Sequence, residues 1–140
     1  MSGCLFCQIA RGDRHAHTVF EKEETVAFLD IFPCTPGHTL VIPRQHYPTL
    51  DEMPAEEAGR LFHVAAVVAG KVQAAMGAAG FNLGVNNGKA AGQEVFHVHI
   101  HIIPRYPNDG GGSMKSVARM SGEKDIEQIA SKIRQTFTRS

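Results

Sequence analysis

Three histidines alternate with apolar residues in one short segment, and this spacing is the strongest chemical signal in the chain. The segment is Phe96-His97-Val98-His99-Ile100-His101-Ile102-Ile103-Pro104. A period of two predicts a β-strand over Val95–Ile103, because successive side chains of a strand point to opposite faces. The three imidazoles would share one face, roughly 6.5–7 Å apart at their Cα atoms. The opposite, core-facing side would carry Phe96, Val98, Ile100 and Ile102.

Such a strand supports two kinds of chemistry, and the residues alone leave both open. The three histidines can jointly ligate a catalytic metal that keeps an open position for water. Alternatively, one imidazole is a nucleophile while its neighbours orient it and handle protons. The central His99 suits the second role, because an imidazole flanks it on each side. The amide of Gln93 lies nearby in sequence, and the preceding turn carries Asn86 and Asn87, which can approach the site.

A second candidate site begins with the pair Cys4-Leu5-Phe6-Cys7. A Cys-x-x-Cys pair alone is half of a zinc site, a redox pair, or neither. The redox interpretation requires a strand before the pair, as in a thioredoxin-like unit, and nothing before Cys4 can form one. A zinc site needs two further ligands. Besides the three alternating histidines, the candidates are His15, His17, His38, His46 and His63.

The histidines outside the alternating segment are not equivalent. His63 falls on a predicted helix and is expected to be an ordinary, partly exposed residue. His15 and His17 lie in a polar turn and are expected to have no role at a metal. Sequence spacing does not choose between His38 and His46.

The composition favours one protein domain and excludes several classes of function. The 140 residues carry 43% hydrophobic side chains, enough for one core, and no repeat or linker divides them. The 14 Lys and Arg residues balance the 14 Asp and Glu residues, which argues against stable nucleic-acid binding. No apolar run approaches the ~18 residues of a transmembrane helix, and Met1–Cys4 opens no signal peptide. Because three cysteines form no secreted disulfide framework, we expect a cytoplasmic protein without membrane association.

The hydrophobic pattern also predicts the elements that position these residues. Short strands are expected at Thr18–Phe20, Val26–Ile31, Thr39–Ile42, Phe81–Val85 and Val95–Ile103. A long helix is expected over Pro54–Met76, with Asp51 as its N-terminal cap. A helical turn at Leu5–Ile9 precedes these elements, and a last helix at Glu123–Phe137 follows them. The hairpin spacings predict the α+β class, with an about five-stranded, mainly antiparallel sheet.

With these motifs in view, the chain resembles the histidine triad superfamily, specifically the bacterial Hint-like branch that carries a Cys-x-x-Cys zinc site. The signature His-φ-His-φ-His-φ-φ, with φ apolar, is met by His97–Ile103, and Pro104-Arg105 continues it. Further matching motifs are Cys4–Ile9, Ala27–Ile31, Gly37–Pro43 and Gly92-Gln93. The resemblance covers residues 4–106, within a single histidine triad domain expected over residues 1–140. Residues 107–140 would be a C-terminal extension of that domain.

The resemblance implies an HIT-like fold and a homodimer whose sheets join edge to edge. It also implies hydrolysis or transfer at the α-phosphate of a nucleotide, with His99 as the nucleophile that forms a nucleotidyl-histidine intermediate. His101 would contact the phosphate and help with proton delivery. Gln93 and Asn86 would hydrogen-bond the phosphate oxygens or the leaving group. His38 would belong to the imidazole network around them.

The same resemblance implies a structural zinc ion in a closed shell of four ligands. These ligands would be Cys4, Cys7, His46 and His97. The zinc would orient His97 beside the nucleophile, as part of the catalytic group. The side chains implied to enclose a purine base are Phe6, Ile9, Phe28 and Ile31. Asp30 corresponds to the carboxylate that accepts hydrogen bonds from both ribose hydroxyls.

Three other functions compete with a phosphoramidase-like nucleotide hydrolase. The Fhit branch of the superfamily cleaves diadenosine polyphosphates, but it lacks the cysteine pair. A nucleotide-binding interaction module with vestigial catalysis has no need of a nucleophile such as His99. A catalytic metal held jointly by the three histidines would make turnover sensitive to chelators.

The end of the chain departs from the best-known phosphoramidases of the superfamily. Those proteins end in a short tail, often with Trp, that reaches the partner's active site. Here the chain has no Trp, and 35 residues follow Arg105. They include the Gly-rich segment Asn108–Ser113, which is expected to be a mobile loop.

Overall fold

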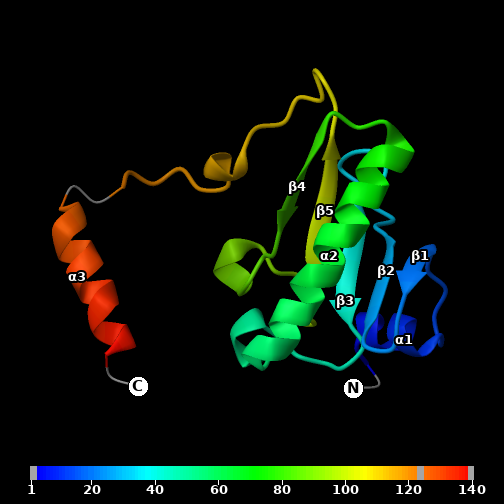
Figure 1. Ribbon diagram of the computed structural model, residues 1–140, viewed down its shortest axis with the longest axis horizontal. Coiled ribbons are helices and arrows are strands. Elements are labelled where there is room, and N and C mark those ends of the chain that lie inside the picture. The colour runs from blue at the N-terminus through cyan, green and yellow to red at the C-terminus, as the bar shows by residue number, and fades with distance from the viewer. Residues whose placement is uncertain (1–2, 123–124, 139–140) are drawn as a thin grey trace.

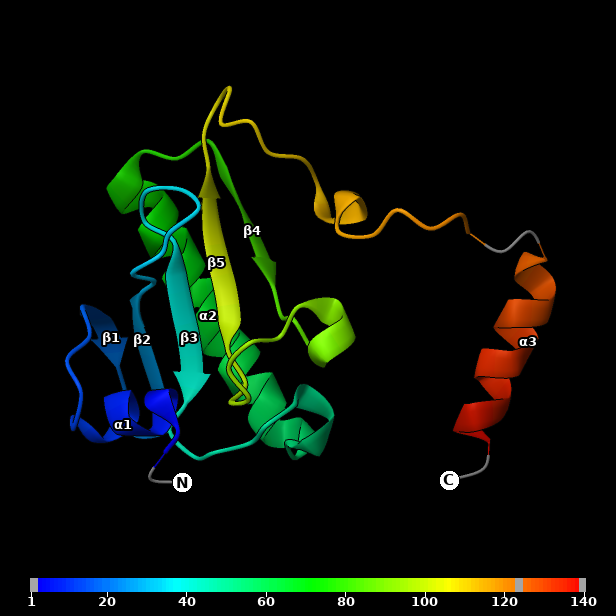
Figure 2. The same ribbon diagram turned by 180° about the vertical axis from the view of Figure 1, so that it is seen from behind.

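Five strands form one antiparallel sheet, in a computed structural model that describes residues 3–122 and 125–138. In spatial order the strands are β1 (Thr18–Glu21), β2 (Thr25–Leu29), β3 (Thr39–Pro43), β5 (Ile100–Arg105) and β4 (Gly80–Gly84). The helix α2 (Ala55–Met76) crosses one face, and α1 (Leu5–Arg11) lies on the other (Figures 1 and 2). The predicted α+β class and the antiparallel sheet are therefore confirmed.

The face of the sheet under α2 holds the main hydrophobic core. Ala27, Val41 and Ile100 form one row of directly paired residues across β2, β3 and β5, and none of them has exposed surface. They pack against the buried stripe of α2, which recurs at helical spacing: Leu61, Ala65, Val68 and Ala69. This core fixes the sheet without using any of the residues predicted to do chemistry.

The opposite face of the sheet carries the residues next to these in each strand. Phe28, Leu40, His101 and Gly84 are directly paired across β2, β3, β5 and β4, so they form one row that points away from α2. Phe28 and Leu40 pack against α1 in a second apolar cluster. The same row therefore runs from an apolar pocket floor to a histidine of the alternating segment.

The alternating segment departs from the predicted strand. The strand begins at Ile100 rather than Val95, because the Val98 N–H donates to the Tyr47 carbonyl at 2.8 Å instead of pairing with a neighbouring strand. The side chains still alternate between the two faces, since every second residue, Val98, Ile100 and Ile102, is buried. Phe96 is 44% exposed, so its predicted place in the core is wrong.

The helix α2 begins and ends for local reasons. Its N-cap is Pro54, and no side chain caps it, so the predicted capping by Asp51 is wrong. Asp51 instead lies in a 3₁₀ turn, Leu50–Glu52, where it accepts a hydrogen bond from Asn87. The helix ends at Gly77, whose left-handed conformation suits glycine.

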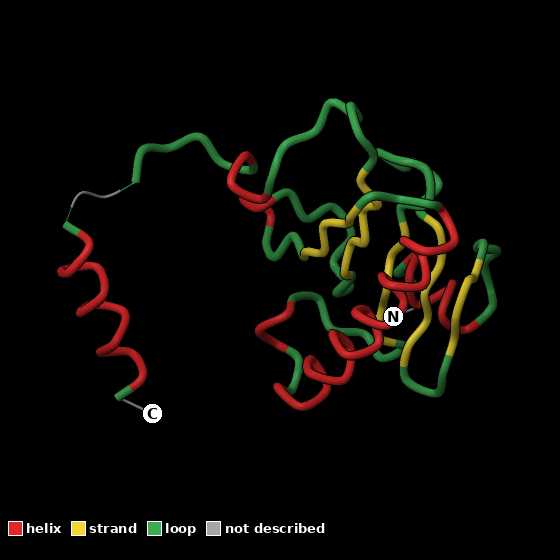
Figure 3. The backbone as a smooth tube through the Cα atoms, turned by 45° about the horizontal axis from the view of Figure 1, so that its top comes forward, coloured by secondary structure: helices red, strands yellow, loops and turns green. Residues whose placement is uncertain are grey.

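The last helix, α3 (Ile126–Phe137), lies apart from the sheet (Figures 1 and 3). Its N-cap is Asp125, and Glu123, where the predicted helix begins, lies outside the described residues. Ile126, Ile133 and Phe137 on this helix are exposed. None of the helices in the described ranges combines the length and apolar character that crossing a membrane requires.

Candidate functional site

The cysteine pair and two histidines converge on one point between α1 and the segment before β5. The Nδ1 atom of His97 lies 3.4 Å from Cys4 Sγ, 3.6 Å from Cys7 Sγ and 3.3 Å from His46 Nδ1. Cys7 Sγ lies 3.4 Å from His46 Nδ1. Cys4 is the N-cap of α1, which places Cys7 one turn later on the same side. Four donor atoms from three separate segments therefore face one another.

The hydrogen bonds of His97 fix its protonation pattern. Its Nε2 lies 2.8 Å from the Pro43 carbonyl, which can only accept, so Nε2 carries the proton and Nδ1 keeps its lone pair. The residue has no exposed surface, and burial lowers the pKa of His97 to about 4. The ring is neutral at pH 7, and its lone pair faces the two sulfur atoms and His46.

This donor set fits a zinc ion. Thiolate and imidazole bind zinc at about 2.3 and 2.0–2.1 Å, so tetrahedral coordination separates neighbouring donor atoms by about 3.3–3.7 Å. The four separations observed, from 3.3 to 3.6 Å, match that requirement. Burial raises the pKa of the Cys7 thiol, and Cys4 beside it adds to this effect, so two thiolates here need a cation between them. The fit covers all four predicted ligands: Cys4, Cys7, His46 and His97.

His99 presents the other ring nitrogen. Its Nδ1 lies 2.8 Å from the carbonyl of His97, so Nδ1 carries the proton and Nε2 keeps the lone pair. The edge of the ring lies against Phe6, with ring centroids 5.0 Å apart. Burial lowers the pKa of His99, although the bond to the His97 carbonyl opposes the shift. A neutral imidazole with a free Nε2 is a nucleophile.

His101 and His38 form a directed chain of hydrogen bonds beside His99. The Cys34 N–H donates to His38 Nδ1 at 3.2 Å, so His38 carries its proton on Nε2 and donates to His101 Nδ1 at 2.9 Å. The proton of His101 is then on Nε2, a buried atom without a hydrogen-bond partner among the described residues. Burial, with the neighbouring His99 and His38, lowers the pKa of His101 to about 4. Burial likewise lowers the pKa of His38, against the effect of Asp30, whose Oδ2 lies 3.6 Å from His38 Nε2.

His99 and His101 line a pocket of about 490 Å³ on the α1 face of the sheet. Its walls combine apolar side chains with a few polar groups, an arrangement typical of small-molecule sites. Eight of the nine predicted nucleotide-binding residues line it: Phe6, Ile9, Phe28, Asp30, Ile31, Asn86, His99 and His101. A buried hydrogen-bond donor without a partner among the described residues, next to a free imidazole nitrogen, suits a ligand with acceptor oxygens.

Comparisons with known proteins agree with this arrangement. The HIT domain family matches residues 11–108, which is more than two thirds of the chain. The chain belongs to the histidine triad (HIT) family. The HIT match begins at residue 11, where α1 ends, so Cys4 and Cys7 lie outside it.

Individual HIT relatives extend the comparison over almost the whole chain. The chain is 39% identical over 133 residues to adenylylsulfatase HINT3 of Arabidopsis thaliana, covering 94% of this chain and 68% of HINT3. It is similar to the crystal structure of SMU.412c from Streptococcus mutans UA159, at 38% identity and a TM-score of 0.88, covering 98% of this chain and 87% of that one. It is also similar to a Zn-bound histidine triad family protein from Mycobacterium smegmatis, at 32% identity and a TM-score of 0.74, covering 99% of each chain.

Gln93 lies differently from the other predicted residues of this HIT site. Its side-chain oxygen accepts from the Gly88 N–H at 2.8 Å, and its nitrogen donates to the carbonyls of Pro48 (2.7 Å) and Val95 (3.1 Å). The amide is buried and does not line the pocket. It ties the loop before β5 to the rest of the site, and contact with a phosphate would require it to leave these partners.

The alternating histidines of this HIT protein do not converge on one metal. The lone pair of His97 faces the cysteines, whereas His99 and His101 line the pocket. Among the described residues, the other group whose donor atoms lie close together is Asp30, His38 and His101. The geometry therefore gives no support to a catalytic metal held jointly by the three.

The HIT pocket also contains residues that the sequence pattern did not single out. Arg14, Phe32 and Glu94 line it, together with His15, which was expected to have no role at a metal and lies outside the metal cluster. No periodicity marks these residues, because they lie in loops around the rim. Asn87, by contrast, is directed away, since its side chain bonds the Leu50 N–H and Asp51.

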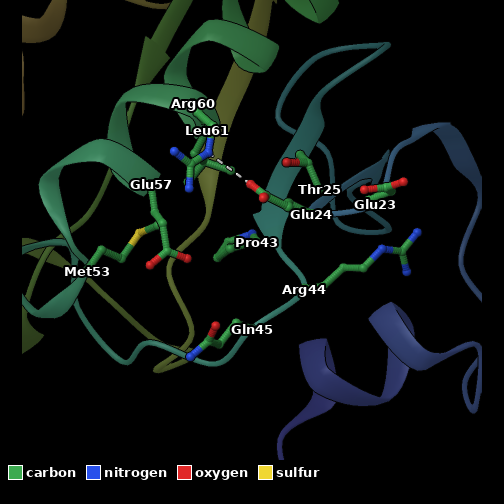
Figure 4. A pocket seen from close by; sticks show the side chains of 10 residues that line it. All are labelled: Glu23, Glu24, Thr25, Pro43, Arg44, Gln45, Met53, Glu57, Arg60 and Leu61. Carbon is green, nitrogen blue, oxygen red and sulfur yellow. Dashed lines mark hydrogen bonds and ion pairs between the residues drawn. The ribbon is translucent and has the colours of Figure 1, made fainter.

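A second hollow of about 220 Å³ lies beside the start of α2 (Figure 4). Half of its lining residues are charged, and among these Arg60 and Glu24 form an ion pair of 3.0 Å. His63 lines a neighbouring surface hollow and is exposed, as predicted. Neither hollow contains a cysteine or one of the alternating histidines.

Proposed function

We propose that this protein is a nucleotide hydrolase or transferase that acts at the α-phosphate of purine nucleoside 5′-phosphoramidates or related nucleotidyl conjugates. The observation that carries the proposal is the free Nε2 of His99, held in a pocket by the bond from Nδ1 to the His97 carbonyl. Membership of the HIT family and the likeness to an adenylylsulfatase support nucleotide chemistry at this site.

The reaction would proceed in two displacements. In the first, His99 Nε2 attacks the α-phosphorus, the bond from phosphorus to the leaving group breaks, and that group keeps the electron pair and takes up a proton from water. In the second, water attacks the nucleotidyl-histidine, a phosphorus–oxygen bond forms, and His99 leaves as a neutral imidazole while a proton passes to solvent. The unpartnered Nε2–H of His101 would donate to the phosphoryl oxygen as charge develops, with His38 holding the ring in that orientation.

The rest of the pocket suits a nucleoside. Phe6 and Phe28 meet edge to face, with ring centroids 5.5 Å apart, and provide an apolar surface for a base. Asp30 lines the same pocket, with Oδ2 3.6 Å from His38 Nε2, and would accept hydrogen bonds from the ribose hydroxyls. We propose a purine as the base, because the apolar walls are large relative to a pyrimidine.

We further propose that Cys4, Cys7, His46 and His97 hold a structural zinc ion. The supporting observations are the tetrahedral separations of the donor atoms and the Zn-bound relative. When bound, this ion would neutralise the thiolates and close its own coordination shell. His97 would stay fixed beside His99, because its carbonyl is the group that orients the nucleophile.

We also propose that the protein is a cytoplasmic homodimer. The C-terminal extension would belong to the same single domain. The outer edge of β4 and the exposed apolar residues of α3 support the homodimer, since an unpaired strand edge and an apolar helix face both favour association.

The decisive test is to incubate the pure protein with adenosine 5′-phosphoramidate and diadenosine tetraphosphate in parallel. We expect AMP to be released from the phosphoramidate by the native protein and by the matched control His63→Ala, but not by His99→Ala. Preference for diadenosine tetraphosphate would assign the alternative branch. If AMP binds and neither compound is cleaved, the protein is a nucleotide-binding module and the proposed hydrolysis is wrong.

A further inference from the structure

The pocket on the α1 face carries a cationic side chain in the segment that joins α1 to β1. This segment lies at the β1 edge of the sheet (Figure 2). Arg14, His15 and Ala16 line the pocket, and they also line a neighbouring hollow of about 310 Å³, so they form a wall between the two. Arg11 and Arg44 line that hollow as well. Of these three arginines, only Arg14 lines the pocket that contains the histidines.

The three arginines differ in their partners. Arg11 Nε forms an ion pair of 3.0 Å with Asp13. Arg44 donates to two backbone carbonyls, at 2.6 and 3.0 Å, and pairs with Glu21 at 3.1 Å. Arg14 is exposed, and within the described ranges no hydrogen bond or ion pair involves its side chain. The N–H donors of its guanidinium are therefore available to a ligand.

The apolar part of the pocket lies next to this arginine. Ile9 and Ala16, on either side of it in sequence, pack against the cluster that contains Phe6 and Phe28. His101 lies two strands away from Phe28, because β3 separates β2 from β5. A nucleotide whose phosphorus is at the histidines and whose base is at the phenylalanines extends from β5 towards β1. The outer edge of its base then faces the segment that carries the arginine.

A guanidinium at this place distinguishes between the two common purines. Its N–H groups are all donors, and they form a fixed fork that suits two neighbouring acceptors. Guanine offers such a pair in O6 and N7, whereas adenine carries an amino donor at position 6 beside N7. Against adenine, one prong of the fork would meet a donor, and one hydrogen bond would be lost.

We propose that Arg14 recognises the base and makes the site selective for purines with an oxygen at position 6, such as guanine and hypoxanthine. This inference rests on the proposed function, in which a purine nucleotide occupies the pocket. The other charged residues that line the pocket are Asp30 and Glu94, and ionised carboxylates cannot donate to O6 or N7. A neutral His15 has a single donor, so it cannot provide the fork.

The first measurement is the affinity for three monophosphates that share the ribose and the phosphate: GMP, IMP and AMP. IMP has the oxygen at position 6 of GMP but lacks its 2-amino group. Calorimetric titration of the native protein is expected to give affinities for GMP and IMP about tenfold higher than that for AMP. Arg14→Met should bring GMP and IMP to within about twofold of AMP and leave AMP unchanged, because it removes the fork and keeps an unbranched side chain.

Two variants separate the fork from its charge and from its surroundings. Arg14→Lys keeps the positive charge but replaces the planar fork with a single ammonium, so it should lose most of the preference. Arg11→Met removes a neighbouring arginine that pairs with Asp13 and does not line the pocket, so the native preference should remain.

Three outcomes would overturn the assignment. Equal weakening of all three nucleotides by Arg14→Met would show that this arginine acts on the shared phosphate or ribose. Native protein that binds AMP as tightly as GMP would show that the site has no such selectivity. Tight binding of GMP, with IMP resembling AMP, would show that a carboxylate recognises the 2-amino group instead.

Turnover separates failure of this inference from failure of the proposed hydrolysis. The ratio of kcat/KM for guanosine 5′-phosphoramidate to that for adenosine 5′-phosphoramidate should fall about tenfold in Arg14→Met. Selective binding of GMP without cleavage of either phosphoramidate would support the role of Arg14 and reject the hydrolysis. Cleavage of both compounds at one rate, by native protein and variant alike, would reject the role of Arg14 and leave the hydrolysis intact.

Discussion

His97 and His99 are two residues apart, yet they use opposite nitrogens and serve different clusters. His97 donates from Nε2 to the Pro43 carbonyl and keeps Nδ1 for the cysteines, whereas His99 donates from Nδ1 to the His97 carbonyl and keeps Nε2 for the pocket. In each case a backbone carbonyl selects the nitrogen that stays free. The residue type gives an imidazole its chemistry, but the position of the nearest carbonyl decides where that chemistry is directed.

The two clusters also differ in completeness. Around His97 the four donor atoms face one another at 3.3–3.6 Å, so the cluster is closed to anything larger than an ion. Around His101 the hydrogen-bond chain from Cys34 through His38 ends in an N–H without a partner among the described residues. A closed set of donors stabilises a fold, and an open chain leaves capacity for a ligand.

Of the substitutions that test this difference between the two clusters, the largest effect is expected at His99. His99→Ala should lower turnover of adenosine 5′-phosphoramidate by roughly 10³-fold or more, because the neighbouring His101 already uses its lone pair to accept from His38. AMP binding and zinc content should be unchanged. AMP release measures turnover, and atomic absorption measures the metal content. His17→Ala is the control, because His17 is exposed. Near-native turnover would remove His99 from the mechanism.

The next effect is on stability and belongs to the closed cluster. Cys4→Ser/Cys7→Ser should lose the proposed zinc and lower Tm by about 10 °C, since that ion would hold α1 to the segment before β5. Cys34→Ser is the matched control, because this cysteine is exposed and lies outside the cluster. Equal metal content in the double variant and the control, measured alongside calorimetry, would show that the ligands are other residues.

A smaller effect is expected at the ribose end of the pocket. Asp30→Asn preserves the shape that accepts the Phe32 N–H at 2.9 Å, but it loses the charge and one acceptor oxygen. AMP should bind about tenfold more weakly, while turnover at saturating phosphoramidate should stay within about twofold. Calorimetric titration gives the affinity, and Asp13→Asn, which alters an exposed ion pair with Arg11, is the control. Unchanged affinity for AMP would place the ribose elsewhere.

The smallest effect is the pH dependence of stability that comes from the open cluster. An unfolded histidine has a pKa near 6.5, whereas burial and its neighbours lower that of His101 to about 4. The unfolded chain therefore binds more protons between these values, so the stability that His101 contributes is full above about pH 6.5 and is lost as the pH falls towards 4. His101→Gln should reduce the loss in free energy of unfolding between pH 7.5 and 5 by about 1 kcal/mol. Urea unfolding at both pH values measures it, and an identical loss in both proteins would contradict this origin.

Local sequence patterns predicted much of the fold and the pocket. Apolar alternation and helical spacing located the five strands and α2, because these periods reflect burial directly. The strand start at Ile100 was missed, since the bond from Val98 to Tyr47 joins residues 51 positions apart and leaves no local signal. The capping of α2 by Asp51 was wrong for a similar reason: Asn87, distant in sequence, bonds this carboxylate.

The family resemblance supplied what local patterns left open at the site. Spacing did not choose between His38 and His46, and the structure places His46 at the cysteines and His38 behind His101. The binding role predicted for Gln93 remains a prediction. In the structure its amide bonds three backbone groups, and no sequence pattern identifies these partners. Arg14 and Glu94 on the pocket rim could not be found either, as they become neighbours only when the sheet is assembled.

The main core and the pocket lie on opposite faces of the sheet, and this separation also determines which mutations the protein can tolerate. The core under α2 contains none of the residues that line the pocket, so changes at the pocket rim, such as Arg14 or Phe32, leave the main core intact. Phe6 and Phe28 belong to both the pocket and the second apolar cluster, so a change there alters ligand fit and stability together. Variation in specificity among descendants of this chain should therefore accumulate at the rim, while the two phenylalanines stay constrained.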